Sequence, residues 1–283
     1  MPAPERVPAG TRPVWRRVTV TRQPEPDDLT LITHGTLELS GRLVDASNAT
    51  LFCTVELDGR TAHAVYKPIA GERPLWDFPD GTLAGREVAT YTIARHSGLG
   101  LIPPTVLRDG PFGPGMVQLW IDTAGEELVD VHRPDEVPDG WRQVLVARDR
   151  SGEPVVLAHA DRPDVAELAV LDVVVNNTDR KGGHVLHGPG DRAYGVDHGI
   201  CLHAEPKLRT VLWGWAGEPL PETAREKLAK LRAAIDGELG EHLAEHITSA
   251  EIRALADRTD KLLAAGVFPT PAEQVRAIPW PLF

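Results

Sequence analysis

The chain has 283 residues, 42% of them hydrophobic and 25% charged, which is enough to bury the core of one large domain or of two lobes. Its formal net charge of −11 argues against a nucleic-acid-binding surface or a polybasic membrane surface, because both need clustered Lys and Arg side chains. Cys53 and Cys201 are too few cysteines for a disulfide framework or a four-cysteine zinc site. We expect a cytoplasmic protein that binds small molecules or other proteins rather than nucleic acid.

The first 26 residues predict an amino-terminal arm. They are rich in Pro and Arg and contain no continuous apolar stretch of the kind found in a secretory signal. Val14–Val20 is the one candidate edge strand in the arm. No run of apolar residues in the chain approaches the roughly 20 that a membrane-spanning helix requires, so we expect no stable association with a membrane.

The next hundred or so positions predict an antiparallel sheet. A short helix capped at residues 27–28 is expected first, and strands are expected over 36–44, 51–57, 61–67, 102–106 and 115–121. Asp58-Gly59 is typical of the turn between the second and third strands. The polar loop 45–50 can place backbone N–H groups on phosphate oxygens, with Ser47 and Asn48 as the candidates; a plain hairpin turn is the alternative.

A charged pair is predicted between the third strand and the helix that follows it. Lys67 ends the strand in the sequence A-V-Y-K-P. The segment G-T-L-A-G-R-E-V-A-T-Y-T-I-A-R-H-S-G then predicts a helix with Glu87 in its first turn and Gly98 as its C-terminal stop. Glu87 can pair with Lys67, although each residue can also be read as a solvated charge.

The second half of the chain predicts mostly helix. An acidic stretch, 122–164, holds one hairpin with its turn at 149–152. A helix follows, and one face of it carries Val165, Leu168, Leu171 and Val175. From Pro221 onward, apolar residues at intervals of three or four form a single stripe, which is typical of a core-facing helix. Ser249 is the expected cap of a further helix and Gly266 its end.

The stretch with the clearest chemistry is LDVVVNNTDRKGGHVLHGPGDRAYGVDHGICLH, residues 171–203. An apolar run leads into a polar turn at 176–180, and two short β-like runs are expected around Asp197. Phosphoryl transfer needs a carboxylate near the incoming hydroxyl and ligands that hold a metal on the nucleotide phosphates. Asp179 fits the first role and Asp197 the second, and His184 can reach the same metal ion. A capped helix end followed by another turn is the alternative interpretation.

These motifs resemble those of the atypical kinases of the phosphatidylinositol 3/4-kinase-like superfamily, which includes the type II phosphatidylinositol 4-kinases and the HipA-like kinases, and more narrowly an actinobacterial branch of it. The catalytic loop of these kinases reads roughly N-x-D-R-x-x-x-N, and a metal-binding Asp follows it. The resemblance implies an α+β, two-lobed protein-kinase-like fold. Its antiparallel β amino-terminal lobe would span residues 27–121, and its mainly helical carboxy-terminal lobe would span 122–283.

The resemblance also implies roles for residues at matching positions. Asp179 matches the catalytic Asp, Arg180 is its neighbour, and Asp197 matches the metal-binding Asp. His184 stands where the family has Asn. Imidazole is a poor ligand for Mg²⁺ and a better one for Mn²⁺ or Zn²⁺, so the identity of the metal depends on this position.

The nucleotide site follows from the same resemblance. Lys67 matches the lysine that holds the α- and β-phosphates, and Glu87 matches its partner. The adenine hinge is expected at the end of the fifth strand, at Gln118, Leu119, Trp120 and Ile121. The cofactors would be ATP with Mg²⁺ or Mn²⁺.

The sequence therefore predicts an ATP- and metal-dependent phosphotransferase with an unknown acceptor, for which a protein or a small molecule is favoured over a lipid. One alternative is a pseudokinase, a nucleotide-binding scaffold without turnover, because His184 replaces the family Asn. A second is a histidine-rich metal site without kinase activity, although the paired spacing H-E-x-x-H is missing. Its candidate ligands are His184, His187, His198 and His203.

Overall fold

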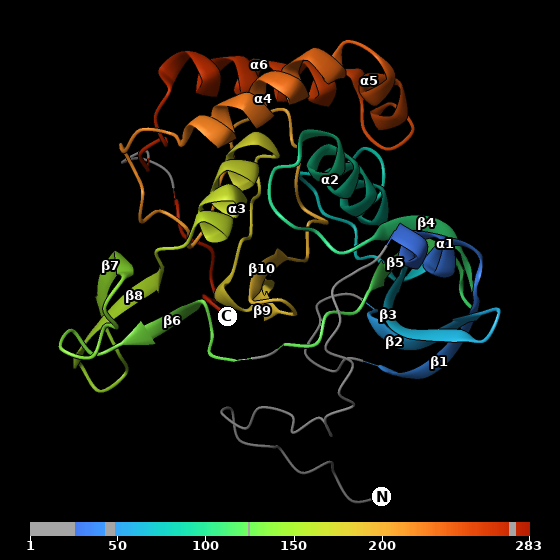
Figure 1. The fold of residues 1–283 in the computed structure, drawn as a ribbon, viewed down its shortest axis with the longest axis horizontal. Helices are drawn as coiled ribbons and strands as arrows, with labels where there is room; N and C mark the ends of the chain where they lie inside the picture. The colour runs from blue at the N-terminus through green and yellow to red at the C-terminus, as the bar shows by residue number, and fades with distance from the viewer. Residues whose placement is uncertain (1–25, 43–48, 124, 272–275) are drawn as a thin grey trace, which may run out of the picture.

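The computed structural model describes residues 26–42, 49–123, 125–271 and 276–283 (Figure 1). Residues 1–25 of the expected arm, with its edge strand Val14–Val20, and the phosphate-loop candidates Ser47 and Asn48 lie outside the described residues. Pro26, the last residue of the expected arm, is the first residue of α1. The part of the chain that is described contains no helix long and apolar enough to cross a membrane.

The first lobe is a five-stranded antiparallel sheet with the strand order β1-β2-β3-β5-β4. Its elements are α1 (Pro26–His34), β1 (Thr36–Arg42), β2 (Leu51–Leu57), β3 (Arg60–Pro68), β4 (Thr105–Gly110) and β5 (Gly113–Leu119). The predicted turn at Asp58-Gly59 is confirmed, and both residues have positive φ angles of 49° and 77°. The strand expected from Ile102 begins only at Thr105. The reason is that Pro103 and Pro104 have no N–H to donate to a ladder.

The two faces of this sheet carry different kinds of side chain. One face packs against α1 in a small core of Leu31, Ile32, Cys53, Val55, Ala64, Tyr66, Val117 and Leu119. Side chains alternate along a strand, so Lys67 points to the opposite face from its buried neighbour Tyr66. Lys67 pairs in register with Met116 of β5. This second face of the sheet therefore carries the predicted phosphate-binding lysine.

Helix α2 (Leu83–Ser97) contributes to the cores of both lobes. Ala84 and Val88 pack with Met116 of the sheet, whereas Ile93 belongs to the large core of the second lobe. The helix starts at Thr82, whose Oγ1 accepts the N–H of Gly85 at 2.9 Å, and it ends at Gly98 in the left-handed conformation, as predicted. Glu87 lies in the second turn rather than the first. The lobe boundary between residues 121 and 122 stays a prediction.

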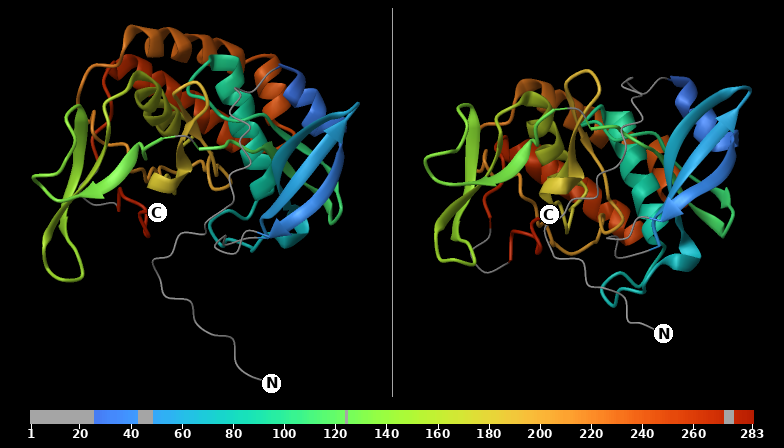
Figure 2. Two further views of the ribbon diagram at one scale, coloured as in Figure 1. Left: turned by 60° about the horizontal axis from the view of Figure 1, so that its bottom comes forward. Right: turned by 90° about the horizontal axis from the view of Figure 1, so that it is seen from below.

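The second lobe contains a three-stranded sheet, a short hairpin and four helices in the described residues. The elements are β6 (Val129–His132), β7 (Trp141–Arg148), β8 (Pro154–Ala160), α3 (Pro163–Val174), β9 (Val185–Gly188), β10 (Arg192–Gly195), α4 (Glu222–Ile235), α5 (Glu238–Leu243) and α6 (Ser249–Ala265). The sheet β6-β8-β7 contains the predicted hairpin and lies on the side of the molecule away from the five-stranded sheet (Figures 1 and 2).

Two expectations for the carboxy-terminal helices need correction. The single apolar stripe from Pro221 is divided between α4 and α5, which separate at Asp236 and Gly237. The cap of α6 is Thr248 rather than Ser249. Thr248 Oγ1 accepts the N–H of Glu251 at 3.3 Å, and the Glu251 carboxylate accepts the N–H of Thr248 at 2.9 Å, so a capping box forms one residue earlier than expected.

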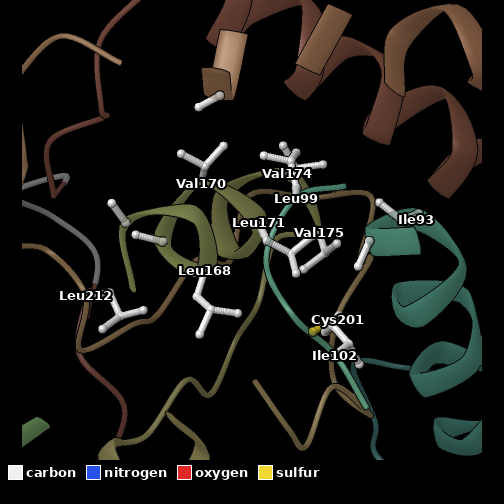
Figure 3. Close-up of a cluster of buried hydrophobic side chains, with 14 of the residues drawn as sticks. Ile93, Leu99, Ile102, Leu168, Val170, Leu171, Val174, Val175, Cys201 and Leu212 are labelled. Carbon is white, nitrogen blue, oxygen red and sulfur yellow. The ribbon is translucent and has the colours of Figure 1, made fainter. Parts of the chain in front are cut away.

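Helix α3 is the centre of the large core, and Figure 3 shows its side chains pointing into several neighbouring elements. The predicted apolar face is buried, and Val170 and Val174 on other sides of the helix are buried as well. The surroundings include Ile93 of α2, Leu99, Ile102, Cys201 and Leu212. Apart from Asp172, the buried side chains of α3 are apolar, which is typical of a core helix. Its carboxy-terminal end is therefore rigidly placed, and the predicted catalytic turn begins there.

Candidate active site between the two lobes

The turn after α3 is held by its two asparagines. Asn176 adopts a left-handed conformation with φ 51°, and its Nδ2 donates to the carbonyl oxygens of His203 and Glu205 at 2.9 and 2.7 Å. Asn177 Oδ1 accepts the N–H of Asp179 at 3.0 Å. Asp179 is thus presented at the surface of the turn with 28% of its side chain exposed, while the residues around it are buried.

A buried ion pair supports this turn from below. The side chains of Asp172 and Arg180 are fully buried, with Arg180 Nη2 2.9 Å from Asp172 Oδ1. Asp172 also accepts hydrogen bonds from Asn177 Nδ2 and Thr210 Oγ1, each at 2.9 Å. Arg180 donates through Nη1 to the carbonyl oxygen of Val196 at 2.9 Å. Arg180, which the sequence placed in the catalytic set, therefore points into the protein and positions Asp179.

Asp197 follows the β9–β10 hairpin. The sequence suggested that the two strands flank Asp197, but both strands end before it. Asp197 has a φ of 59°, a left-handed conformation that Asp adopts more readily than most residues. About half of its side chain is exposed. Backbone strain of this kind is concentrated at functional sites, where the surrounding structure holds it in place.

Lys67 lies between two carboxylates, one from each side of the interface. Its Nζ is 2.7 Å from Oε1 of Glu87 and 2.9 Å from Oδ1 of Asp197. Burial alone would lower the pKa of Lys67, but Asp197 and Glu87 together raise it above its ordinary value. The Lys67 ammonium in turn holds the pKa of Asp197 well below its usual range. Both groups are therefore charged at neutral pH.

His198 continues this network into the second lobe. Its backbone N–H donates to Oε2 of Glu87 at 2.8 Å, and its Nε2 lies 2.6 Å from Nη2 of Arg180. Because a guanidinium only donates, Nε2 is the acceptor and this imidazole is neutral. The resulting chain of contacts across the interface is Asp172, Arg180, His198, Glu87, Lys67 and Asp197. Sequence reasoning missed Asp172 and the role of His198; a lone carboxylate inside the apolar run LDVVV was the available signal.

The donor atoms near Asp197 fit a divalent metal ion. His184 Nε2 lies 3.3 Å from Asp197 Oδ2, and two ligands at right angles, each about 2.1 Å from an ion, are about 3 Å apart. Burial lowers the pKa of His184 to about 4, so the ring is neutral at pH 7, as a metal ligand must be. Within the described residues no group of three or more His, Cys, Asp or Glu side chains is arranged to hold a metal. The remaining ligands would have to come from nucleotide and water.

The same geometry excludes the alternative of a four-histidine metal site. His187 bonds the carbonyl oxygen of Glu126 and the carboxylate of Asp191, and His203 packs edge-on against Phe78. His198 is buried, and its Nε2 accepts a hydrogen bond from Arg180. Each of the four histidines therefore contacts different residues, and of the four only His184 contacts Asp197.

The structure uses much of the predicted hinge in packing. Gln118 is buried, and its Nε2 donates to Thr105 Oγ1 at 2.8 Å. The backbone N–H groups of Leu119 and Trp120 donate to carbonyl oxygens within the first lobe. Trp120 also packs edge-on against Phe52, with ring centroids 5.0 Å apart. A cavity of about 160 Å³ lies beside Trp120 and continues to Ile121 and Asp122. Backbone groups for a base would thus come from the end of the predicted hinge.

The fold that positions these residues is kinase-like. The crystal structure of the Golgi casein kinase matches 84% of this chain and 73% of its own, with a TM-score of 0.50 and 12% sequence identity. The crystal structure of the Helicobacter pylori proinflammatory kinase CtkA matches 84% of this chain and 94% of its own, with a TM-score of 0.43 and 10% identity. The match to the Golgi casein kinase confirms the predicted two-lobed kinase-like α+β fold.

Sequence comparison gives the family. The chain is 48% identical over 267 residues to protein Rv2133c of Mycobacterium tuberculosis, an alignment that covers 91% of this chain and 96% of that protein. The chain belongs to the family of this mycobacterial protein. No family model matches the chain.

Proposed function

We propose that this protein is an ATP- and metal-dependent phosphotransferase, an atypical kinase of the phosphatidylinositol 3/4-kinase-like superfamily. The observation that carries the proposal is the contact of Lys67 with both Glu87 and Asp197 across the interface of a kinase-like fold. In kinases a lysine of this kind holds the nucleotide phosphates, and its glutamate partner orients it. The acceptor would be a protein or a small molecule rather than a lipid, because the chain carries a net charge of −11.

The roles follow from position and charge. Lys67 would bind the α- and β-phosphates, and Asp197 with His184 would hold Mg²⁺ or Mn²⁺, which neutralises charge on the phosphates when bound. Asp179 would orient the acceptor hydroxyl and take its proton. Burial raises the pKa of Asp179, which moves this carboxyl toward the range useful for a general base. Ion pairing with Lys181, Nζ to Oδ2 3.3 Å, limits that rise.

The pseudokinase alternative is supported by one observation. His184 occupies the position at which the resembling kinases have Asn, and imidazole is a weaker ligand for Mg²⁺ than an oxygen donor. A protein that binds nucleotide through Lys67 but cannot place the metal would have no turnover. The distance from His184 to Asp197 allows both to bind one ion, and the imidazole donor favours Mn²⁺ over Mg²⁺.

The test is ATP turnover by purified protein with Mg²⁺ or Mn²⁺, for the wild type and for Asp179→Asn. The proposal predicts slow ADP formation in the wild type, larger with Mn²⁺, and a loss of about 100-fold or more in Asp179→Asn. Asp139→Asn removes an exposed carboxylate 40 positions before Asp179. It is the matched control and should keep wild-type turnover. Tight binding of nucleotide without turnover in either metal would instead support the pseudokinase.

A further inference from the structure

The segment that follows Asp197 brings two basic residues, Lys207 and Arg209, to the turn that carries Asp179. Residues 207–211 run beside residues 176–180 and are bonded to them along their length. The contacts are Lys207 N to Asn176 Oδ1 at 2.9 Å, Arg209 N to Asn177 O at 2.8 Å, Arg180 N to Arg209 O at 3.0 Å and Val211 N to Arg180 O at 3.2 Å. The backbone N–H and carbonyl of Arg209 are therefore both bonded to the turn that carries Asp179, the residue proposed to orient the acceptor.

Arg209 has no protein partner for its guanidinium in the described part of the chain. Its Nε is buried and makes no hydrogen bond. Arg180, whose backbone is bonded to that of Arg209, is paired with Asp172 instead. Arg86 also has a buried Nε without a partner, but its guanidinium is paired with Glu251 at 2.6 Å. A buried donor without a partner costs free energy, and a ligand that accepts from it removes that cost.

The Asp179 carboxylate is close enough to Arg209 to interact with it electrostatically. Arg209 is close enough to lower the pKa of Asp179 electrostatically, yet the ion pair of Asp179 is with Lys181. The Arg209 guanidinium is thus free to take an anion beside the place where the acceptor hydroxyl would lie. Arg presents a planar fork that matches phosphate and carboxylate oxygens in a bidentate manner.

The outer edge of this region has a second cation and an aromatic surface. Lys207 stands two residues before Arg209 in this segment. Lys207 Nζ contacts Asp77 at 3.1 Å and lies 5.6 Å from the ring centroid of Trp76. Trp76 is 91% exposed, which is unusual for a tryptophan that serves only packing. Its free face can cover the apolar face of a sugar or polyol.

We infer that the acceptor is a polyol or sugar that carries a phosphate group, and that Arg209 is the residue that binds this phosphate. The inference rests on the proposed phosphotransferase function. In the transfer, the acceptor oxygen forms a bond to the γ-phosphorus of ATP, and the bond from that phosphorus to the β,γ-bridging oxygen breaks. ADP leaves, and the proton of the acceptor hydroxyl goes to the Asp179 carboxylate.

The experiment uses glycerol 3-phosphate as the probe and glycerol as the matched neutral compound. Calorimetric titration into the full chain with ADP and Mn²⁺ should show binding of glycerol 3-phosphate and none of glycerol. In Arg209→Gln the affinity for glycerol 3-phosphate should fall at least about tenfold, while the affinity for ADP with Mn²⁺ stays within about twofold. Lys230→Gln on the exposed face of α4 is the charge-matched control and should bind like the wild type.

A second arm separates a free phosphate compound from a lipid headgroup, which presents the same chemistry. Cosedimentation with phosphatidylcholine vesicles that contain phosphatidylglycerol should show no Arg209-dependent binding if the acceptor is a free compound. Arg209-dependent binding to these vesicles would support the same phosphate contact with a lipid source. Equal binding of glycerol 3-phosphate by wild type and Arg209→Gln would overturn the assignment of Arg209. Arg209-dependent phosphorylation of an acidic peptide, without any response to glycerol 3-phosphate, would overturn the acceptor class.

The two proposals fail in different ways. If ADP with Mn²⁺ binds but glycerol 3-phosphate does not, the acceptor inference is wrong and the phosphotransferase proposal stands. If neither nucleotide nor metal binds, the phosphotransferase proposal fails, and the acceptor inference fails with it.

Discussion

Lys67 and Asp197 are 130 residues apart in the chain, yet Nζ of the lysine lies 2.9 Å from Oδ1 of the aspartate. The lysine comes from the sheet of the first lobe, and the aspartate follows a hairpin of the second. Glu87 reinforces the contact because one of its oxygens accepts from Lys67 and the other accepts the backbone N–H of His198. The interface therefore holds one cation and two carboxylates in contact with one another.

The first prediction concerns this lysine. Lys67→Ala should reduce ATP turnover by about 100-fold or more, because the variant lacks the cation that would face the phosphates. It should also abolish most of the stabilisation that ADP with Mn²⁺ gives to the wild type. Steady-state kinetics and thermal unfolding measure both effects. Lys230→Ala, exposed on α4, is the control, and wild-type turnover in Lys67→Ala would rule out the assigned role.

A second prediction concerns the metal. His184→Asn restores the side chain that the resembling kinases have, and replaces an imidazole by an oxygen donor that suits Mg²⁺ better. The ratio of turnover with Mn²⁺ to turnover with Mg²⁺ should fall by on the order of tenfold. The measurement is ATP turnover across a series of concentrations of each metal. An unchanged ratio would mean that His184 does not contact the ion.

The buried pair beneath the turn gives a prediction on stability. Asp172→Asn leaves the guanidinium of Arg180 buried without a counter-charge, which should lower the free energy of unfolding by about 3–5 kcal/mol. Urea unfolding at neutral pH measures this. Asp260→Asn breaks the ion pair with Arg232, in which the aspartate is 54% exposed, and should cost less than about 1 kcal/mol. Similar losses in the two variants would contradict the supporting role of Asp172.

The fourth prediction is a pH dependence that comes from His159. This residue is fully buried, its Nε2 accepts the N–H of Gly214 at 3.1 Å, and burial lowers its pKa to about 4. The unfolded chain takes up this proton near pH 6.5 and the folded protein only near pH 4. The stability associated with neutral His159 is therefore complete above pH 6.5 and is lost as the pH falls toward 4, by about 3 kcal/mol in all.

The measurement is the difference in unfolding free energy between wild type and His159→Gln from pH 7 to pH 4. As the pH falls, the unfolding free energy of the wild type should decrease relative to that of the variant, because glutamine does not titrate. A constant difference across this range would show that His159 does not titrate as described.

The sequence predicted the parts of this site that depend on local order. Strand, turn and helix patterns placed Lys67, Glu87 and the turn of Asp179 on the right elements, because alternation and capping are local properties. It could not show that Arg180 points inward, since that depends on Asp172 being buried beneath the turn. The contact of Glu87 with His198 joins residues 111 positions apart, and no local pattern reports it. The cap of α6 differed by one residue because Ser is by itself a somewhat better cap than Thr, whereas Glu251 stands three residues after Thr248 and completes a capping box with it.

The most direct test of the central claim is thermal unfolding of the wild type and Asp197→Ala with ADP, alone and with Mg²⁺ or Mn²⁺. A ligand that binds only the folded state raises the unfolding midpoint with its occupancy. We expect ADP to raise the midpoint of the wild type in the presence of metal, most with Mn²⁺, and to leave that of Asp197→Ala unchanged. If ADP with either metal leaves the wild type unchanged, or stabilises both proteins equally, Lys67 and Asp197 do not form a nucleotide–metal site.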